Sequence, residues 1–136
     1  MSIVVDASVA LKWVLDEPGK QAADALLERE LIAPSLWLLE AANALWRRAH
    51  RGELTPDEVK ERLAELGNAP VAATAIEDDL AAATDLALVF DHPVYDCIYL
   101  ALALRENTHL VTADRRFQSI AAGFPSTAHA VRLLQP

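Results

Sequence analysis

Four acidic residues of this 136-residue chain stand in apolar surroundings, where a charge is expensive without a partner. Asp6 follows the apolar run Ile3-Val4-Val5, and Asp114 follows a similar run that ends at Ala113. Glu40 and Asp96 interrupt apolar stretches with helical character. Each acid also has a simpler interpretation. Asp6 or Asp114 can cap a helix, Asp96 can stabilise a helix start, and Glu40 can pair with an arginine.

Taken together, the four acids predict a metal site. Two follow strands and two lie on apolar helices, so they can converge at one edge of a sheet. Converging carboxylates repel one another unless cations neutralise them, and Mg²⁺ or Mn²⁺ prefers such oxygen ligands. Bound ions of this kind activate water and stabilise the leaving oxygen in phosphodiester hydrolysis. The four histidines are scattered and Cys97 is the single cysteine, which argues against a zinc site.

The elements that would hold these acids alternate between short strands and helices. Strands are expected at 3–5, 31–33, 71–74 and 109–112, with a final one within 128–133. Helices are expected at 8–15, 20–29, 36–51, from 55 to about 67, 77–89, 94–105 and 115–121. This order predicts an α/β fold in one domain, residues 1–136. Its four or five mostly parallel strands would be flanked by helices on both sides.

Local signals mark several helix starts. Ser35 is expected to cap the helix that carries Glu40, and Thr55-Pro56 with Glu58 forms a capping-box pattern. The acids at 77–79 are expected in the first turn of the next helix, where the dipole favours negative charge.

The composition narrows the class of protein. Apolar residues make up 53% of the chain, which is enough for a folded core. We expect no membrane-spanning helix and no leader peptide, and therefore a cytoplasmic protein. The net charge of −8 argues against a broad nucleic-acid-coating surface. It leaves room for a local basic rim beside an acidic site, since salt screens charges over about 8–10 Å.

The chain resembles the PIN-domain ribonucleases, specifically the VapC-type toxins of toxin–antitoxin pairs. The resemblance covers nearly the whole chain and depends on the order and spacing of four motifs. These are Val5-Asp6-Ala7-Ser8, Pro34-Ser35 leading to Glu40 and Asn43, Tyr95-Asp96 followed by 98–103, and 110–114 ending in Asp114. His92-Pro93 before the third motif is the one departure, and it leaves the start of that helix in doubt.

The resemblance implies an acidic, metal-dependent RNA-cleaving site. Its catalytic acids would be Asp6, Glu40, Asp96 and Asp114. Asp6 and Asp96 match the positions usually named as magnesium ligands, with Glu40 and Asp114 as further or water-mediated ligands. Ser8, Asn43 and Thr112 would give polar support. A VapB-type antitoxin is the implied partner, and it often covers the acidic site.

Two further groups of residues have open interpretations. Arginines near the acids are candidates for holding RNA phosphates, or are solvated side chains at a helix end: Arg47, Arg48, Arg51, Arg115 and Arg116. The three tryptophans either belong to the core or contribute to a homodimer interface or an antitoxin groove: Trp13, Trp37 and Trp46.

Other functions compete with the ribonuclease. An aspartyl phosphatase would use Asp6 as a nucleophile, but it usually needs an acid two residues later, where Ser8 stands. A non-catalytic binding module would have no need for the full set of acids. A DNA or structure-specific nuclease stays open, because a metal site does not select the sugar.

Overall fold

The computed structural model describes residues 1–135 and contains one sheet of five parallel strands in the order β3-β2-β1-β4-β5. The strands are β1 (Ser2–Val5), β2 (Glu30–Pro34), β3 (Val71–Thr74), β4 (Leu110–Thr112) and β5 (Val131–Leu133). Because β1 is central, its end is surrounded by other elements. The predicted α/β class and the five strands are confirmed.

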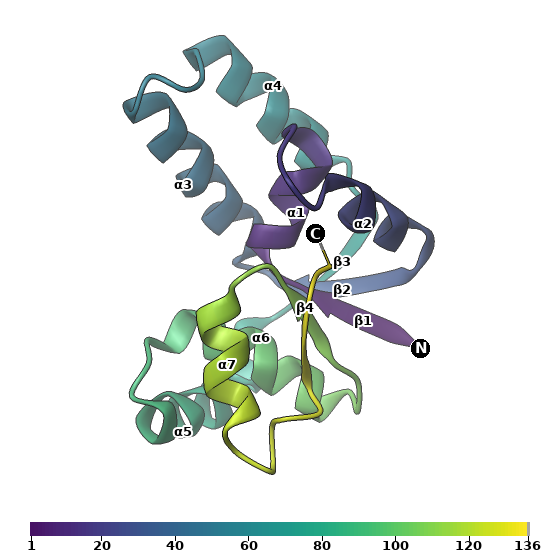
Figure 1. Cartoon of the computed structure of the whole chain (residues 1–136), viewed down its shortest axis with the longest axis vertical. Coiled ribbons are helices and arrows are strands. Elements are labelled where there is room, and N and C mark those ends of the chain that lie inside the picture. Colours follow the sequence, from purple (N-terminus) through teal and green to yellow (C-terminus); the bar gives the residue numbers. More distant parts are fainter. Residues whose placement is uncertain (136) are drawn as a thin grey trace.

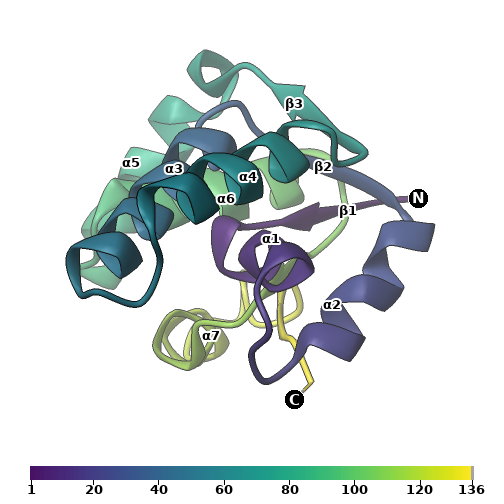
Figure 2. The same ribbon diagram turned by 90° about the horizontal axis from the view of Figure 1, so that it is seen from above.

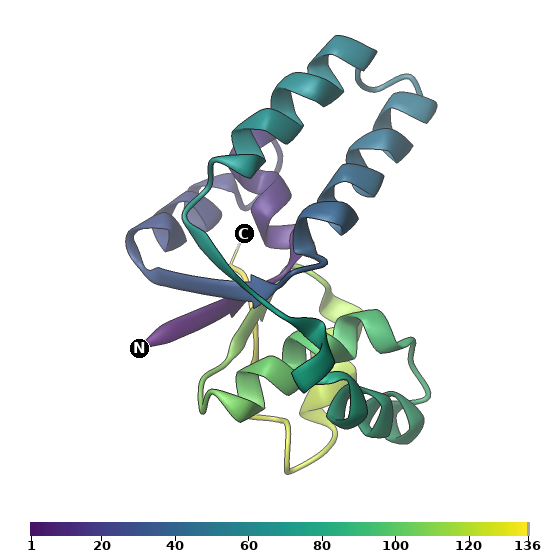
Figure 3. The same cartoon turned by 180° about the vertical axis from the view of Figure 1, so that it is seen from behind.

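Seven α-helices surround the sheet: α1 (Ala7–Val14), α2 (Lys20–Ala25), α3 (Trp37–His50), α4 (Pro56–Gly67), α5 (Leu80–Phe90), α6 (Val94–Arg105) and α7 (Arg115–Ala122). Short 3₁₀ turns follow α2 at Leu26–Glu28 and precede α5 at Ile76–Asp78. In Figure 1, α1 to α4 lie above the sheet and α5 to α7 below it. Figures 2 and 3 show α3 and α4 side by side, and in Figure 3 this pair extends away from the sheet.

Successive side chains of β1 point to opposite faces of the sheet and so belong to two separate apolar clusters. Val4 belongs to the larger apolar cluster with α6, whereas Ile3 and Val5 pack with Val9 of α1 and Ala23 of α2. Helix α6 is the most buried helix, because every residue from Cys97 to Ala103 is in the core. Burial fixes its position tightly, and its first turn carries Asp96.

Two expected helix starts differ from the structure. Ser35 does not cap α3: the N-cap position is Leu36, without a side-chain hydrogen bond, and Ser35 is exposed. The acids at 77–79 do not occupy the first turn of α5, which begins at Leu80. Asp79 instead accepts hydrogen bonds from Arg105 of α6 at 2.6 and 3.0 Å, so a long-range partner outweighs the local helix-start signal.

No single helix within residues 1–135 is both long and apolar enough to cross a membrane. Helices α5 and α6 reach that length and composition only together, as a pair bent by 119°.

Candidate active site

Asp6 lies at the end of the central strand and is 8% exposed. It caps α1 by accepting a hydrogen bond from the Val9 amide at 3.2 Å. The same carboxylate accepts bonds from the hydroxyls of Ser8, at 2.6 Å, and Thr112. The cap expected for Asp6 is therefore present, and a polar network holds the side chain as well.

The environment of Asp6 disfavours its negative charge. Burial raises the pKa of Asp6 to about 6, although the bonds from Ser8, Thr112 and the Val9 amide partly oppose this. The negative charge of Asp96 makes a smaller contribution to this raised pKa. A bound cation would reverse this penalty.

Glu40 projects from α3 toward α6. The Tyr99 hydroxyl of α6 donates to Glu40 Oε1 at 2.5 Å, a contact that joins residues 59 apart in the sequence. Burial raises the pKa of Glu40, and the charges of Asp96 and Asp6 raise it further, against the lowering effects of Tyr99 and Arg47. Burial and the neighbouring Glu40 charge also raise the pKa of the Tyr99 hydroxyl, so Tyr99 stays a donor.

Asp96 is the acid whose charge acts on both Asp6 and Glu40. It lies in the first turn of α6, and its Oδ2 is 2.7 Å from Nε2 of His92. The His92 ring also lies against Phe117 of α7, with ring centroids 5.1 Å apart. The His92-Pro93 departure therefore contacts the acidic site directly. Three of the four acids, from three separate elements, act electrostatically on one another.

Asp114 has a different environment from the other three acids. Its side chain caps α7 by accepting from the Phe117 amide at 3.1 Å. Its own amide donates to Thr112 Oγ1 at 3.0 Å, and Thr112 in turn donates to Asp6. Asp114 is not among the main causes of the raised pKa values of Asp6 and Glu40. It is joined to the site through the Thr112 hydroxyl.

The donor chemistry of these acids suits a hard divalent cation, because carboxylate oxygens are the ligands such ions prefer. Within residues 1–135, however, no three acid, histidine or cysteine side chains lie close enough together to hold one ion. Glu40 and Asp96 instead each direct one oxygen to a protein partner, Tyr99 and His92.

A groove adjoins the acids on the side of α3. It has a volume of about 580 Å³, and its lining residues are Leu36, Leu39, Glu40, Asn43, Arg47 and Tyr95. Of the three residues expected to give polar support, Ser8 and Thr112 donate hydrogen bonds to the Asp6 carboxylate. Asn43 lines the groove together with Glu40.

The five candidate arginines differ in whether a carboxylate is paired with them. Arg48 pairs with Glu17 at 2.7 Å, and Arg51 pairs with Glu53 at 2.9 Å. Arg47 lines the groove and has no ion pair among the described residues. Arg115 borders a smaller cavity with Lys12, and Arg116 is exposed. Among Arg47, Arg48 and Arg51, Arg47 is therefore the one without a carboxylate partner in the described part of the chain.

Sequence reasoning missed two residues of this site, Tyr99 and His92. Each lies one helical turn from Asp96 in sequence, at spacings of three and four. That spacing is the signal that could have revealed them.

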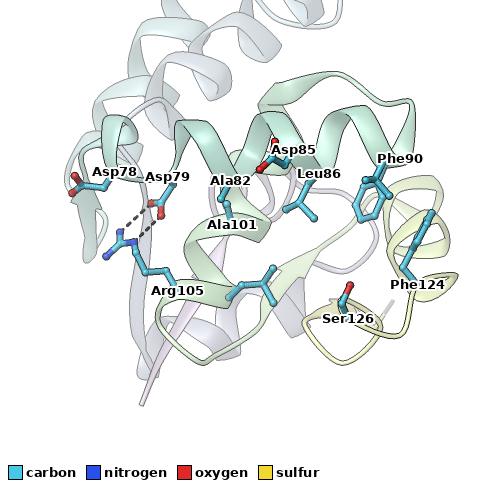
Figure 4. A pocket seen from close by; sticks show the side chains of 12 residues that line it. Asp78, Asp79, Ala82, Asp85, Leu86, Phe90, Ala101, Arg105, Phe124 and Ser126 are labelled. Atoms are coloured by element: carbon cyan, nitrogen blue, oxygen red, sulfur yellow. Dashed lines mark hydrogen bonds and ion pairs between the residues drawn. The ribbon is translucent and has the colours of Figure 1, made fainter.

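A second cavity, of about 550 Å³, lies between α5 and α6 and contains none of the four acids. Figure 4 shows the Asp79–Arg105 pair at one end and Phe90 beside Phe124 at the other. The four candidate catalytic acids therefore lie outside this cavity.

Comparison with known proteins identifies the fold family. Ribonuclease VapC3 of Pyrobaculum aerophilum is 37% identical over 130 residues, which cover 93% of this chain and 97% of that protein. The crystal structure of VapC20 from Mycobacterium tuberculosis, a sarcin–ricin-loop-cleaving toxin, superimposes with a TM-score of 0.68 at 17% identity, covering 91% and 97% of the two chains. The crystal structure of VapBC2 of Rickettsia felis, bound to a DNA fragment from its promoter, superimposes with a TM-score of 0.69 at 12% identity. The match covers 99% of this chain and 100% of that chain.

The PIN domain family model matches residues 3–123, which include all four acids, the groove and the sheet apart from Ser2 and β5. The chain belongs to the PIN domain family.

Proposed function

We propose that this protein is a divalent-metal-dependent endoribonuclease and the toxin of a toxin–antitoxin pair. The observation that carries the proposal is the electrostatic coupling of Asp6, Glu40 and Asp96 at the carboxyl end of the central strand. Family membership and the 37% identity to a named ribonuclease support the same reaction.

Asp6 and Asp96 are the proposed ligands of Mg²⁺ or Mn²⁺, and Glu40 and Asp114 complete or orient the ligand shell. When bound, such an ion supplies positive charge that activates water and stabilises the leaving oxygen. Ser8 and Thr112 fix the orientation of the Asp6 carboxylate. Tyr99 holds one oxygen of Glu40, and burial raises the pKa of Glu40, which favours a role in accepting a proton.

The groove beside Glu40 is the proposed path of the RNA. Arg47 can hold a phosphate there, Asn43 can donate a hydrogen bond, and the exposed ring of Tyr95 can stack on a base.

A VapB-type antitoxin is the proposed partner of this surface. Leu39, Trp46 and Tyr95 are 73%, 57% and 65% exposed, and two of them line the groove. An antitoxin segment with apolar side chains and a cation would cover these residues and oppose the acids.

The exposed Leu88 and Val89 of α5 support a homodimer, which light scattering at several concentrations can measure.

The central test is loss of RNA cleavage in Asp6→Asn and Asp96→Asn. Both changes remove a charge at nearly constant shape, so cleavage of total RNA should fall at least about a hundredfold. Asp85→Asn on α5, outside the site, is the matched control and should cleave like wild type. Chelator should abolish wild-type cleavage, and added Mg²⁺ or Mn²⁺ should restore it.

The same assay separates the rival functions. Hydrolysis of a small phosphomonoester by wild type but not by Asp6→Asn would favour the phosphatase. Preference for single-stranded DNA over RNA would favour a DNA nuclease. Calorimetry without heat of metal binding, together with intact RNA, would favour the binding module. Full cleavage by either Asn variant would refute the proposed site.

A further inference from the structure

A cavity of about 510 Å³ lies near the amino-terminal ends of the strands, whereas Asp6 lies at the carboxyl end of β1. Asp6 and Asp114 follow the carboxyl ends of β1 and β4, whereas this cavity lies where β1, β4 and β5 begin. The lining residues are Met1, Arg29, Leu104, Asn107, Thr108, His109, His129 and Arg132. None of them belongs to the proposed nuclease site.

Four nitrogen-rich side chains from three segments meet in this cavity. Arg29 precedes β2, His109 precedes β4, and His129 and Arg132 come from the start of β5. Arg29 and Arg132 both act electrostatically on His109, and burial together with their charges lowers the pKa of His109. At neutral pH, two guanidinium groups therefore lie beside an uncharged imidazole.

These four side chains have no partners of their own within residues 1–135. None is in an ion pair, and none makes a side-chain hydrogen bond. By contrast, Arg48, Arg51, Arg62 and Arg105 are each paired with a carboxylate. No acidic side chain lines the cavity, although Glu28 and Glu30 flank Arg29 in the sequence. In a chain of net charge −8, this is a local concentration of unneutralised positive charge.

One feature of the cavity opposes anion binding. The carboxyl end of α6 contributes Leu104 to the wall, and a helix end of this kind carries about half a negative charge. The carbonyls of Ala103 and Leu104 are already occupied by the amides of Thr108 and Asn107. Two full guanidinium charges outweigh that dipole.

We propose that this cavity binds a phosphate group. Paired guanidinium groups match phosphate oxygens in bidentate geometry, and imidazole N–H groups supply further donors. The volume exceeds the needs of an isolated ion and lies in the range of about 300–1,000 Å³ typical of small-ligand sites. The phosphate can belong to a free nucleotide or to the backbone of RNA.

The test is NMR of the histidine imidazoles during titration with inorganic phosphate and with adenosine 5′-monophosphate, in chelator. Resonances of His109 and His129 should shift, while those of His50 and His92, which lie elsewhere, should stay in place. The mononucleotide should bind more tightly than inorganic phosphate, because it fills more of the cavity.

Arg29→Gln/Arg132→Gln should weaken phosphate binding at least about tenfold, since each arginine supplies charge-assisted hydrogen bonds. Both side chains are exposed, so the variant should fold, and each single substitution serves as a second measurement. Arg62→Gln, which removes a surface arginine paired with Glu65, is the matched control and should bind like wild type. Absence of shifts at His109 and His129, or unchanged binding by the double variant, would overturn the proposal.

A short single-stranded RNA, added in chelator, distinguishes the two sources of phosphate. Shifts at His109 and His129 that disappear in the double variant would assign the site to the RNA backbone. Shifts with the mononucleotide alone would assign it to a free small ligand. Neither result depends on the nuclease proposal, because no metal or cleavage is involved.

Discussion

The carboxyl group of Asp6 is held where its charge costs free energy. Its pKa is about 6 in the folded chain against 3.8 in the unfolded chain, so the folded state retains the proton between about pH 4 and 6. Its contribution to stability is therefore fully present below pH 4 and is lost as the pH rises through 6. A difference of about two pKa units corresponds to about 1–3 kcal/mol.

Asp6→Asn should therefore stabilise the metal-free protein at pH 7.5 by about 1–3 kcal/mol and have little effect near pH 4. Asn keeps an oxygen that can cap α1 and accept from Ser8, and its NH₂ group can donate to the Thr112 hydroxyl oxygen, so the change removes the charge and reverses one hydrogen bond. Chemical denaturation in chelator at both pH values measures the difference. Equal stability of variant and wild type at pH 7.5 would contradict the raised pKa.

Tyr99 illustrates how a residue can act through a neighbouring acid. Tyr99→Phe removes the donor to Glu40 without creating a large cavity, and the pKa of Glu40 should rise further. We expect cleavage at neutral pH to fall several-fold and the acidic limb of the pH–rate profile to move to higher pH. The exposed Tyr95→Phe is the control and should leave the profile in place. An unchanged profile for Tyr99→Phe would mean that the tyrosine only fills space.

At the scale of elements, the α3–α4 pair extends from the sheet, and local capping adds to the contacts that α3 and α4 make with the core. Thr55 and Glu58 form a reciprocal capping box at the start of α4, with bonds of 3.1 and 3.0 Å. Thr55→Ala should cost about 1 kcal/mol. For a chain of this size the melting temperature should fall by about 3–5 °C. Thr84→Ala, inside α5, replaces a hydroxyl that bonds only to the Leu80 carbonyl and should not lower it.

Elements with local causes were predictable from sequence. The capping box, α6 at 94–105 and β3 at 71–74 all occur where their patterns indicate. Ser35 is not a cap, since the N-cap position of α3 is Leu36 without a side-chain hydrogen bond. Asp79 lies outside the first turn of α5, and Arg105 of α6 is its long-range partner. The strand order was also beyond local reasoning.

The acids of the candidate site could be proposed from sequence because charge in an apolar run needs an explanation. The hydrogen-bond partners of these acids could not be proposed from sequence. The Tyr99–Glu40 contact joins residues 59 apart and the Thr112–Asp6 contact residues 106 apart, and single-sequence patterns do not encode such pairings.

For the whole molecule, the net charge of −8 repels RNA everywhere except near unpaired cations. Arg47→Ala should therefore weaken RNA binding and reduce the slope of log K against log salt by about 0.7, the value for one single-strand phosphate contact. Arg51→Ala, which removes an arginine already paired with Glu53, should change the slope less. Binding titrations in chelator at several salt concentrations measure both. Equal slopes would contradict the role of Arg47.

The central position of β1 also sets the order of events during synthesis. β1 leaves the ribosome before the strands beside it, and its neighbour β4 is translated more than a hundred residues later, about 5–20 s at typical elongation rates. Until then Asp6 lacks Thr112, and one side of β1 stays unpaired. A nascent chain that ends before β4 thus carries three of the four acids without the network that orients the first. The proposed toxin would gain its active arrangement only after β4 has been translated.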